Sequence, residues 1–357
     1  GAPRASIYMG QNNKEDAEKT LGNCFATQIL VAIVLTIVLL FGNRTFLLAF
    51  GASENTISYA AAYMNIYAVG TIFVQLTLGL NAFITAQGFA KTGMLSVLIG
   101  AVINIVLDPI FIYVFGMGVK GAALATIISQ GVSCLWVLKF LTGKKTVLKI
   151  RLKNLVLDGK IVTSVLSLGV SPFIMQATEC LIQLTFNNGM LKYGNDLYVA
   201  LMSILFSLTQ LIWMPLNGFS QGAQPVIGYN YGAKEYKRVN KIYNLALMIA
   251  FGIMAVGTAL FMFTPETFMK MFTTQPSTIT AGASALRIIS CGFIVSSVSV
   301  VSSGALEGLG KGNESLAVSL LRYLIIIVPL AFVLSQFSGV SGVWHSFWIT
   351  EAITAII

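Results

Sequence analysis

The chain has 357 residues, of which 56% are apolar and only 10% are charged, with a formal net charge of +9. Soluble domains carry about 25% charged residues, so this chain has too few charged side chains to cover the surface of a soluble protein of its length. The composition therefore predicts a polytopic membrane protein and argues against a soluble enzyme, a nucleic-acid-binding protein and a disulfide-stabilised scaffold.

The apolar residues form ten blocks, many of them close to the roughly 20 residues that a helix needs to cross a bilayer. Helices are expected because backbone polar groups in lipid must be hydrogen-bonded within the protein. The fold class predicted is therefore all-α. The ten predicted spans cover residues 22–50, 56–86, 93–115, 121–142, 161–190, 197–221, 242–264, 279–305, 315–337 and 341–357.

The basic residues support this topology. Sixteen Lys and Arg residues fall before the first span or in alternate connections on the same side, and four fall on the other side. Because cytoplasmic loops are enriched in Lys and Arg, the chain is predicted to start in the cytoplasm. The longest basic connection, residues 143–160, is predicted to be a cytoplasmic segment at the lipid headgroup boundary. It separates an N-terminal lobe (residues 1–142) from a C-terminal lobe (residues 161–357).

The two lobes carry an internal repeat. Identical residues recur in order at a spacing of about 220 residues: Gly10 with Gly232, Gly88 with Gly308, Pro109 with Pro329, and Gly118 with Gly339. The spans covering 161–221 have no upstream counterpart, so about 60 residues holding helix 1 and most of helix 2 are expected to be missing. The parent fold is predicted to have twelve helices in two pseudo-symmetric six-helix bundles, an arrangement found in some secondary transporters.

Asp108 is the most costly residue within a predicted span, because an ionised carboxylate at mid-membrane costs about 3 kcal/mol or more. Asn104 lies one helical turn earlier on the same face. Pro109 follows and cannot donate a hydrogen bond to the carbonyl of Ile105, so a kink is predicted. A carboxylate, an amide oxygen and a carbonyl in proximity would suit a proton or a sodium ion.

Gln176 and Glu179 follow Pro172 in the fifth predicted span and are candidate substrate or proton sites. Glu307 is predicted to be solvated at a helix end. The pairs Gly218/Gly222 and Gly304/Gly308 predict close helix contacts. Arg287 and Arg322 lie within spans, but spacing alone does not identify their partners.

The chain resembles the MATE (multidrug and toxic compound extrusion) transporters, in the DinF-like and MepA-like bacterial branch. The resemblance is carried by GAPRASIYMGQNNKEDAEKTLG (1–22), AQGFAKTGM (86–94), GAVINIVLDPIFI (100–112), GVKGAALATIISQ (118–130), NGFSQGAQPVIGYNYGAK (217–234) and EGLGKG (307–312). In this branch the first lobe holds a cation site. Asn104 and Asp108 match its helix 5 residues and Thr126 matches its helix 6 threonine, whereas its helix 1 Asp would lie in the absent segment. Glu179 lies near, but about one residue out of register with, a helix 7 acid of another branch.

The resemblance implies a multi-pass antiporter of the bacterial inner membrane that exports cationic, amphipathic compounds in exchange for H⁺ or Na⁺ by alternating access of its two lobes. A monomer with no cofactor and no nucleic-acid partner is expected. An alternative is a flippase for lipid-linked saccharides or lipids, which would line its cavity with several cationic residues. An intramembrane enzyme is disfavoured because one His and one central Asp assemble no catalytic constellation.

Overall fold

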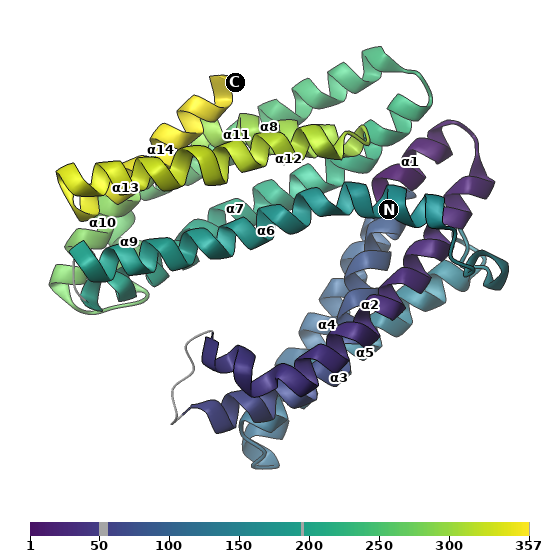
Figure 1. Ribbon diagram of the computed structural model, residues 1–357, viewed down its shortest axis with the longest axis horizontal. Helices are drawn as coiled ribbons and strands as arrows, with labels where there is room; N and C mark the ends of the chain where they lie inside the picture. Colours follow the sequence, from purple (N-terminus) through teal and green to yellow (C-terminus); the bar gives the residue numbers. More distant parts are fainter. Residues whose placement is uncertain (50–55, 194–195, 357) are drawn as a thin grey trace. The chain divides into compact units, whose positions relative to one another are not determined.

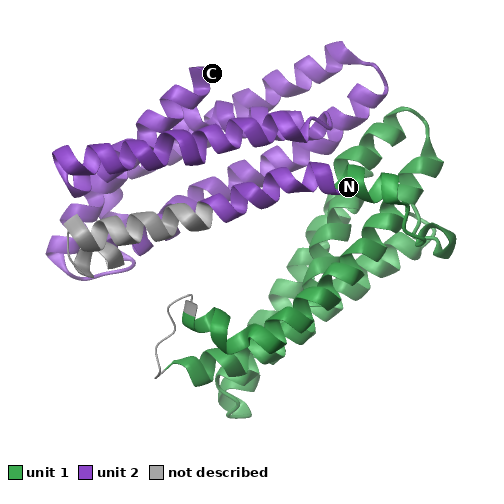
Figure 2. Cartoon of the chain, in the orientation of Figure 1, with its two compact units in different colours: residues 1–165 green, residues 166–357 purple. Residues whose placement is uncertain are grey.

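The computed structural model describes the backbone of residues 1–49, 56–193 and 196–356, and the side chains of residues 1–48, 56–178 and 201–356. The chain forms two compact units, residues 1–165 and residues 166–357 (Figure 2). All the regular structure described is helical (Figure 1).

The first unit contains α1 (Ala2–Gly10), α2 (Lys14–Ala49), α3 (Ile57–Ala86), α4 (Ala90–Pro109), the π-helical turn η1 (Ile110–Val114), α5 (Val119–Thr142) and the 3₁₀ turn η2 (Leu152–Asn154). Helix α6 (Gly159–Tyr193) begins at the end of this unit and continues into the second. The second unit then contains α7 (Asp196–Gly232), α8 (Tyr236–Phe263), α9 (Pro265–Lys270), α10 (Pro276–Ser290), α11 (Phe293–Gly308), α12 (Gly312–Leu320), the π-helical turn η3 (Leu321–Ile326), α13 (Ile327–Ser338) and α14 (Val340–Ile356).

The ten predicted spans all fall on helices. Within the described residues, eight helices are long and apolar enough to cross a membrane, and the pair α10–α11 makes a ninth if it is counted as one span. The remaining predicted span is α14, which has 17 residues. The fold class predicted from composition and block length, an all-α polytopic membrane protein, is confirmed.

The ninth span is broken, which the hydrophobic pattern does not predict. Helices α10 and α11 meet at an angle of 52° around Cys291 and Gly292. At Gly292 an added Cβ atom would lie 2.8 Å from the Cα atom of Trp348 in α14. The glycine therefore permits a close approach of α14 at the bend.

Each unit has its own apolar core. In the first unit α3 packs against α2 and α5, and its residues Leu80 and Ile84 are fully buried. In the second unit α7, α8 and α11 pack against one another. The prediction for Gly304 and Gly308 is confirmed, since an added Cβ at either would clash with Ser220 or Gln224 of α7.

The prediction for Gly218 and Gly222 is not confirmed by the residues whose side chains are described, and it stays a prediction. An added Cβ atom at either position would meet no described atom within 4 Å. Spacing of four residues places both glycines on one helix face, but it does not identify which face a neighbouring helix covers.

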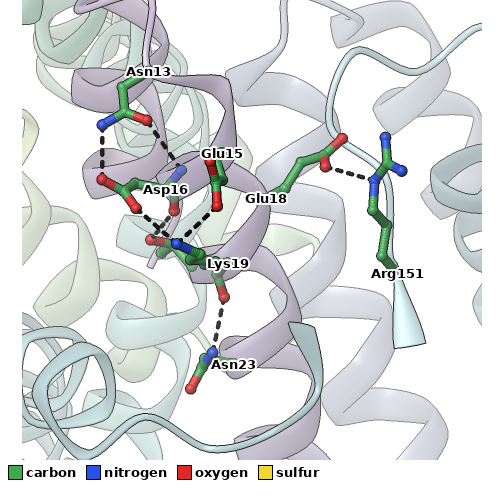
Figure 3. Close-up of polar contacts among 8 residues, drawn as sticks. Asn13, Glu15, Asp16, Glu18, Lys19, Asn23 and Arg151 are labelled. Atoms are coloured by element: carbon green, nitrogen blue, oxygen red, sulfur yellow. Dashed lines mark hydrogen bonds and ion pairs between the residues drawn. The ribbon is translucent and has the colours of Figure 1, made fainter. Parts of the chain in front are cut away.

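The basic segment after α5 is attached to the first unit by three polar side chains, those of Gln87, Glu18 and Asn23. Gln87 Oε1 accepts hydrogen bonds from Thr146 Oγ1 and from the backbone N–H groups of Val147 and Leu148, each at 2.8 Å. Glu18, whose side chain is 8% exposed, accepts a hydrogen bond from Arg151 Nε at 2.7 Å (Figure 3). Leu148 is fully buried as a result.

Asn23 holds the end of the same segment. Its Oδ1 atom accepts a hydrogen bond from the backbone N–H of Asp158 at 2.7 Å, and its Nδ2 donates to the carbonyl of Asn154 at 3.4 Å. In contrast, Leu152 and Val156 are 85% and 77% exposed. The basic segment thus has one face packed on the first unit and one apolar face exposed, and its position at the headgroup boundary stays a prediction.

Candidate functional site

Asn104 and Asp108 lie together near the end of α4. Asn104 Nδ2 donates a hydrogen bond to Asp108 Oδ1 at 3.3 Å, and both side chains are half-buried. Residues four apart on a helix face the same direction, so the pair is a direct consequence of the local sequence.

The helix changes its hydrogen-bonding pattern directly after this pair. Pro109 ends α4 without a backbone N–H to donate, and the chain continues into the π-helical turn η1. In η1 the N–H of Phe115 bonds to the carbonyl of Ile110 at 2.9 Å, five residues earlier. Single π-helical turns are frequent at functional sites. The predicted disturbance at Pro109 therefore takes the form of a π-helical turn.

Thr126 lies on the neighbouring helix α5, which packs against α4. Its hydroxyl donates to the carbonyl of Ala122 in its own helix at 2.9 Å. No hydrogen bond joins Thr126 to Asn104 or Asp108, all three of which have described side chains. Nor do the described residues bring three or more His, Cys, Asp or Glu side chains together as a metal site.

The second unit contains a cavity of about 330 Å³ between α7, α11, η3 and α14. Its aromatic wall is formed by Phe206, Trp213, Phe293, Tyr323 and Phe347. Polar atoms enter it from a different set of side chains: Gln176, Thr209, Gln210, Asn217, Arg322 and Glu351. An apolar pocket with a few convergent polar groups is the usual character of a small-molecule site.

A buried ion pair lies in this cavity. Arg322, in η3, donates from Nε to Glu351 Oε1 at 3.0 Å, and its Nη2 donates to the same oxygen. The side chains of Arg322 and Glu351 are only 6% and 13% exposed. The guanidinium also lies 5.3 Å from the ring centre of Trp213 and 4.8 Å from that of Tyr323. Cation–π contacts and the carboxylate together compensate the burial of the arginine.

A second cavity of about 200 Å³ shares Gln176, Trp213 and Asn217 with the first, as well as Arg322 and Tyr323. It extends to Glu307, where Gln224 Nε2 donates to Oε2 at 2.9 Å and Ser315 Oγ donates to Oε1 at 3.2 Å. The prediction that Glu307 is solvated is therefore wrong. Its position at a helix end suggested solvent, but α7 and α12 supply hydrogen-bond donors there.

Comparison with known proteins decides what kind of molecule holds these features. A sequence profile of the MatE family matches residues 1–110 and 172–333, more than half of the chain. The chain belongs to the MatE family. It is thus a multi-pass membrane transporter rather than an enzyme.

Relatives of this MatE-family chain are similar over most of its length. Multidrug export protein MepA of Staphylococcus haemolyticus is 27% identical over 306 residues, which are 86% of this chain and 67% of that protein. MepA of Staphylococcus aureus strain N315 is 26% identical over 325 residues, 91% of this chain and 71% of that one. A solved structure described as an outward-facing conformation of a multidrug resistance MATE family transporter has a TM-score of 0.95 at 25% identity, and the match covers 99% of this chain and 80% of that chain.

The predicted site residues of this MatE-family chain have different outcomes. The structure brings Asn104 and Asp108 together and places Gln176 at both cavities of the second unit. Glu179 lies outside the residues whose side chains are described. The Arg322–Glu351 pair was not predicted, because the partners are 29 residues apart on different elements. The sequence does contain a signal for such a pair, because Arg322 and Glu351 are charged residues in two separate apolar spans.

Proposed function

We propose that this MatE-family transporter exports cationic, amphipathic compounds in exchange for H⁺ or Na⁺, with Asp108 as the residue that binds the coupling ion. The observation that carries the proposal is the Asn104–Asp108 pair beside Pro109 and its π-helical turn. A half-buried carboxylate in a membrane helix is costly, and exchange between an ionised state and a protonated or cation-bound state gives that residue a function.

Coupling requires that ion binding and substrate binding favour different conformations. The backbone at Pro109 and η1 is the element suited to respond, because it already departs from regular α-helical bonding directly after the carboxylate. In the proposed cycle, loading Asp108 changes the geometry of this turn, and the two lobes alternate in access to the two sides of the membrane. We further propose that the transporter acts as a monomer.

The substrate class is proposed from the relatives and from the second unit. The curated relatives named above are multidrug export proteins. The aromatic wall of the first cavity and the carboxylate of Glu307 at the second suit organic cations. The alternative, a flippase for a saccharide pyrophosphate, is less well supported. Arg322 is neutralised by Glu351, and Arg287 donates from Nε to the carbonyl of Met262 at 3.3 Å.

The proposal is tested with the protein reconstituted in vesicles. Export of a fluorescent organic cation is followed under an imposed proton gradient and then under a sodium gradient. The expected result is export driven by one of the two, and its loss in Asp108→Asn. Normal gradient-driven export by a correctly folded Asp108→Asn protein would contradict the assignment of Asp108.

A further inference from the structure

The two oxygens of Glu351 have unequal environments. Oε1 accepts both hydrogen bonds from Arg322. Oε2 is buried and accepts no hydrogen bond from any of the residues with described side chains. A buried carboxylate oxygen without a donor is unfavourable, so Oε2 is an acceptor that a donor group on a bound ligand would satisfy.

The surroundings of Oε2 restrict the kind of ligand that can supply a hydrogen-bond donor to it. Glu351 lines the 330 Å³ cavity together with the rings of Trp213, Phe293 and Phe347. This volume and this wall suit a flat aromatic molecule. Arg322 neutralises the charge of Glu351, so a bound cation meets a neutral ion pair rather than a free carboxylate. Beside neutral polar side chains such as Gln210 and Asn217, Oε2 offers a polar ligand group a carboxylate acceptor.

We infer that Glu351 selects aromatic ligands that carry an N–H donor, such as amidines, guanidines and primary amines, over aromatic cations without one. A protonated amidine places an N–H group on Oε2 while its rings stack in the cavity. A trimethylammonium group of equal charge makes the same aromatic contacts but donates nothing to Oε2. This inference specifies a substrate class within the proposed function and rests on it.

The test compares two probes of equal charge and similar aromatic area, 4-phenylbenzamidine and (biphenyl-4-yl)trimethylammonium. Equilibrium binding to the purified protein is measured by calorimetry, without any ion gradient. The Glu351→Gln substitution puts an amide N–H₂ group in the place of one carboxylate oxygen. That group donates hydrogen bonds and does not accept one from the amidine. The charge of Arg322, no longer neutralised by a carboxylate, should weaken the binding of both cations in this variant. We expect the amidine to lose about tenfold or more affinity beyond the loss of the trimethylammonium compound.

The matched control is Glu266→Gln, which makes the same chemical change at an exposed residue of the same unit. Glu266 is 61% exposed and faces Lys270 at 4.0 Å, so neither probe should change affinity. Because Glu351→Gln leaves Arg322 buried without its carboxylate, the double variant Arg322→Gln/Glu351→Gln is measured in parallel. This variant keeps the cavity neutral, so it should show about a tenfold or greater loss for the amidine and less than a twofold change for the trimethylammonium compound.

A ligand site in this cavity also predicts a spectroscopic change. Bound amidine should alter the fluorescence of Trp213, and Trp213→Phe should remove that change while retaining binding. Equal losses for both probes, or no loss for either, would overturn the inference. Because binding is measured without a gradient, selective binding without export would contradict the proposed function alone, and export without selectivity would contradict this inference alone.

Discussion

Gly118 and Gly339 adopt nearly the same backbone conformation at matching positions of the two units. Their φ and ψ angles are 55° and −130° for Gly118 and 59° and −137° for Gly339. Each directly precedes a helix, α5 or α14. Asn12 and Lys234 also share a positive φ, of 58° and 59°, before α2 and α8. The repeat inferred from residue identities is therefore also present in the backbone.

Substitution of Gly118 or Gly339 by alanine should destabilise the protein by about 1–3 kcal/mol, because this backbone region is nearly restricted to glycine. An added Cβ at either position meets no described atom within 4 Å, so the cost is conformational rather than steric. Thermal unfolding in detergent measures it. Gly218→Ala is the control. Gly218 lies inside helix α7, where an added Cβ meets no described atom within 4 Å, so alanine there should be neutral or slightly stabilising. Equal melting temperatures for all three variants would contradict the argument.

The repeat also shows how far residue identity can mislead. Matching Gly88 with Gly308 gives a spacing of 220, but the turn containing Gly88, with φ of 87°, corresponds to the turn containing Gly310, with φ of 77°. In both turns the glycine N–H bonds to a carbonyl three residues earlier, at Thr85 and Glu307. Glu307 therefore corresponds to Thr85 at a spacing of 222. The sequence contains enough information to find the repeat, but backbone conformation is needed to set its register.

The basic segment after α5 provides a second prediction. Glu18→Ala should release residues 144–153 from the first unit, because it removes the acceptor of Arg151 Nε and of the Lys149 N–H. Limited digestion with trypsin measures this release, and cleavage in the segment should become several-fold faster. Glu15→Ala is the control. Glu15 is 73% exposed and its partner is Lys19 in the same helix, so its loss should leave the cleavage rate unchanged.

Pro109 is predicted to matter for transport more than for stability. Pro109→Ala supplies an N–H and a good helix former, so the melting temperature should stay equal or rise. If the π-helical turn responds to Asp108, export driven by the coupling ion should fall about tenfold while substrate affinity is retained. Pro276→Ala is the matched control, since Pro276 stands at the first residue of α10, where no intrahelical N–H bond is lost. Unchanged export by Pro109→Ala would remove η1 from the proposed coupling.

The parts of the site predicted from sequence are those determined by local spacing. Asn104 and Asp108 are four residues apart in a helix, so their contact follows from helical geometry. The contact between Arg322 and Glu351 depends on how η3 and α14 pack, which spacing does not reveal. At Thr126 the expectation rests on resemblance and stays a prediction, and its hydroxyl donates to the carbonyl of Ala122 in its own helix.

The two units differ in where they hold charge, despite their common architecture. The segment that corresponds to Asp108 in the second unit, residues 328–330, is Val-Pro-Leu, and the residue that corresponds to Glu351 in the first unit is Gln130. In each unit, however, a π-helical turn lies at the charged residue, after Asp108 in one and around Arg322 in the other. This division favours separate tasks for the units, ion binding in the first and ligand binding in the second.

The Arg322–Glu351 pair allows a test of whether its two charges depend on each other for stability. Each single variant, Arg322→Gln or Glu351→Gln, removes one charge of the buried pair and should cost about 3–5 kcal/mol. The double variant removes both charges, so its cost should be below the sum of the two by a coupling of about 1–3 kcal/mol. Thermal or denaturant unfolding of the four proteins in detergent gives this cycle. Additive losses would mean that Glu351 does not compensate the burial of Arg322, and that Trp213 and Tyr323 stabilise the guanidinium without it.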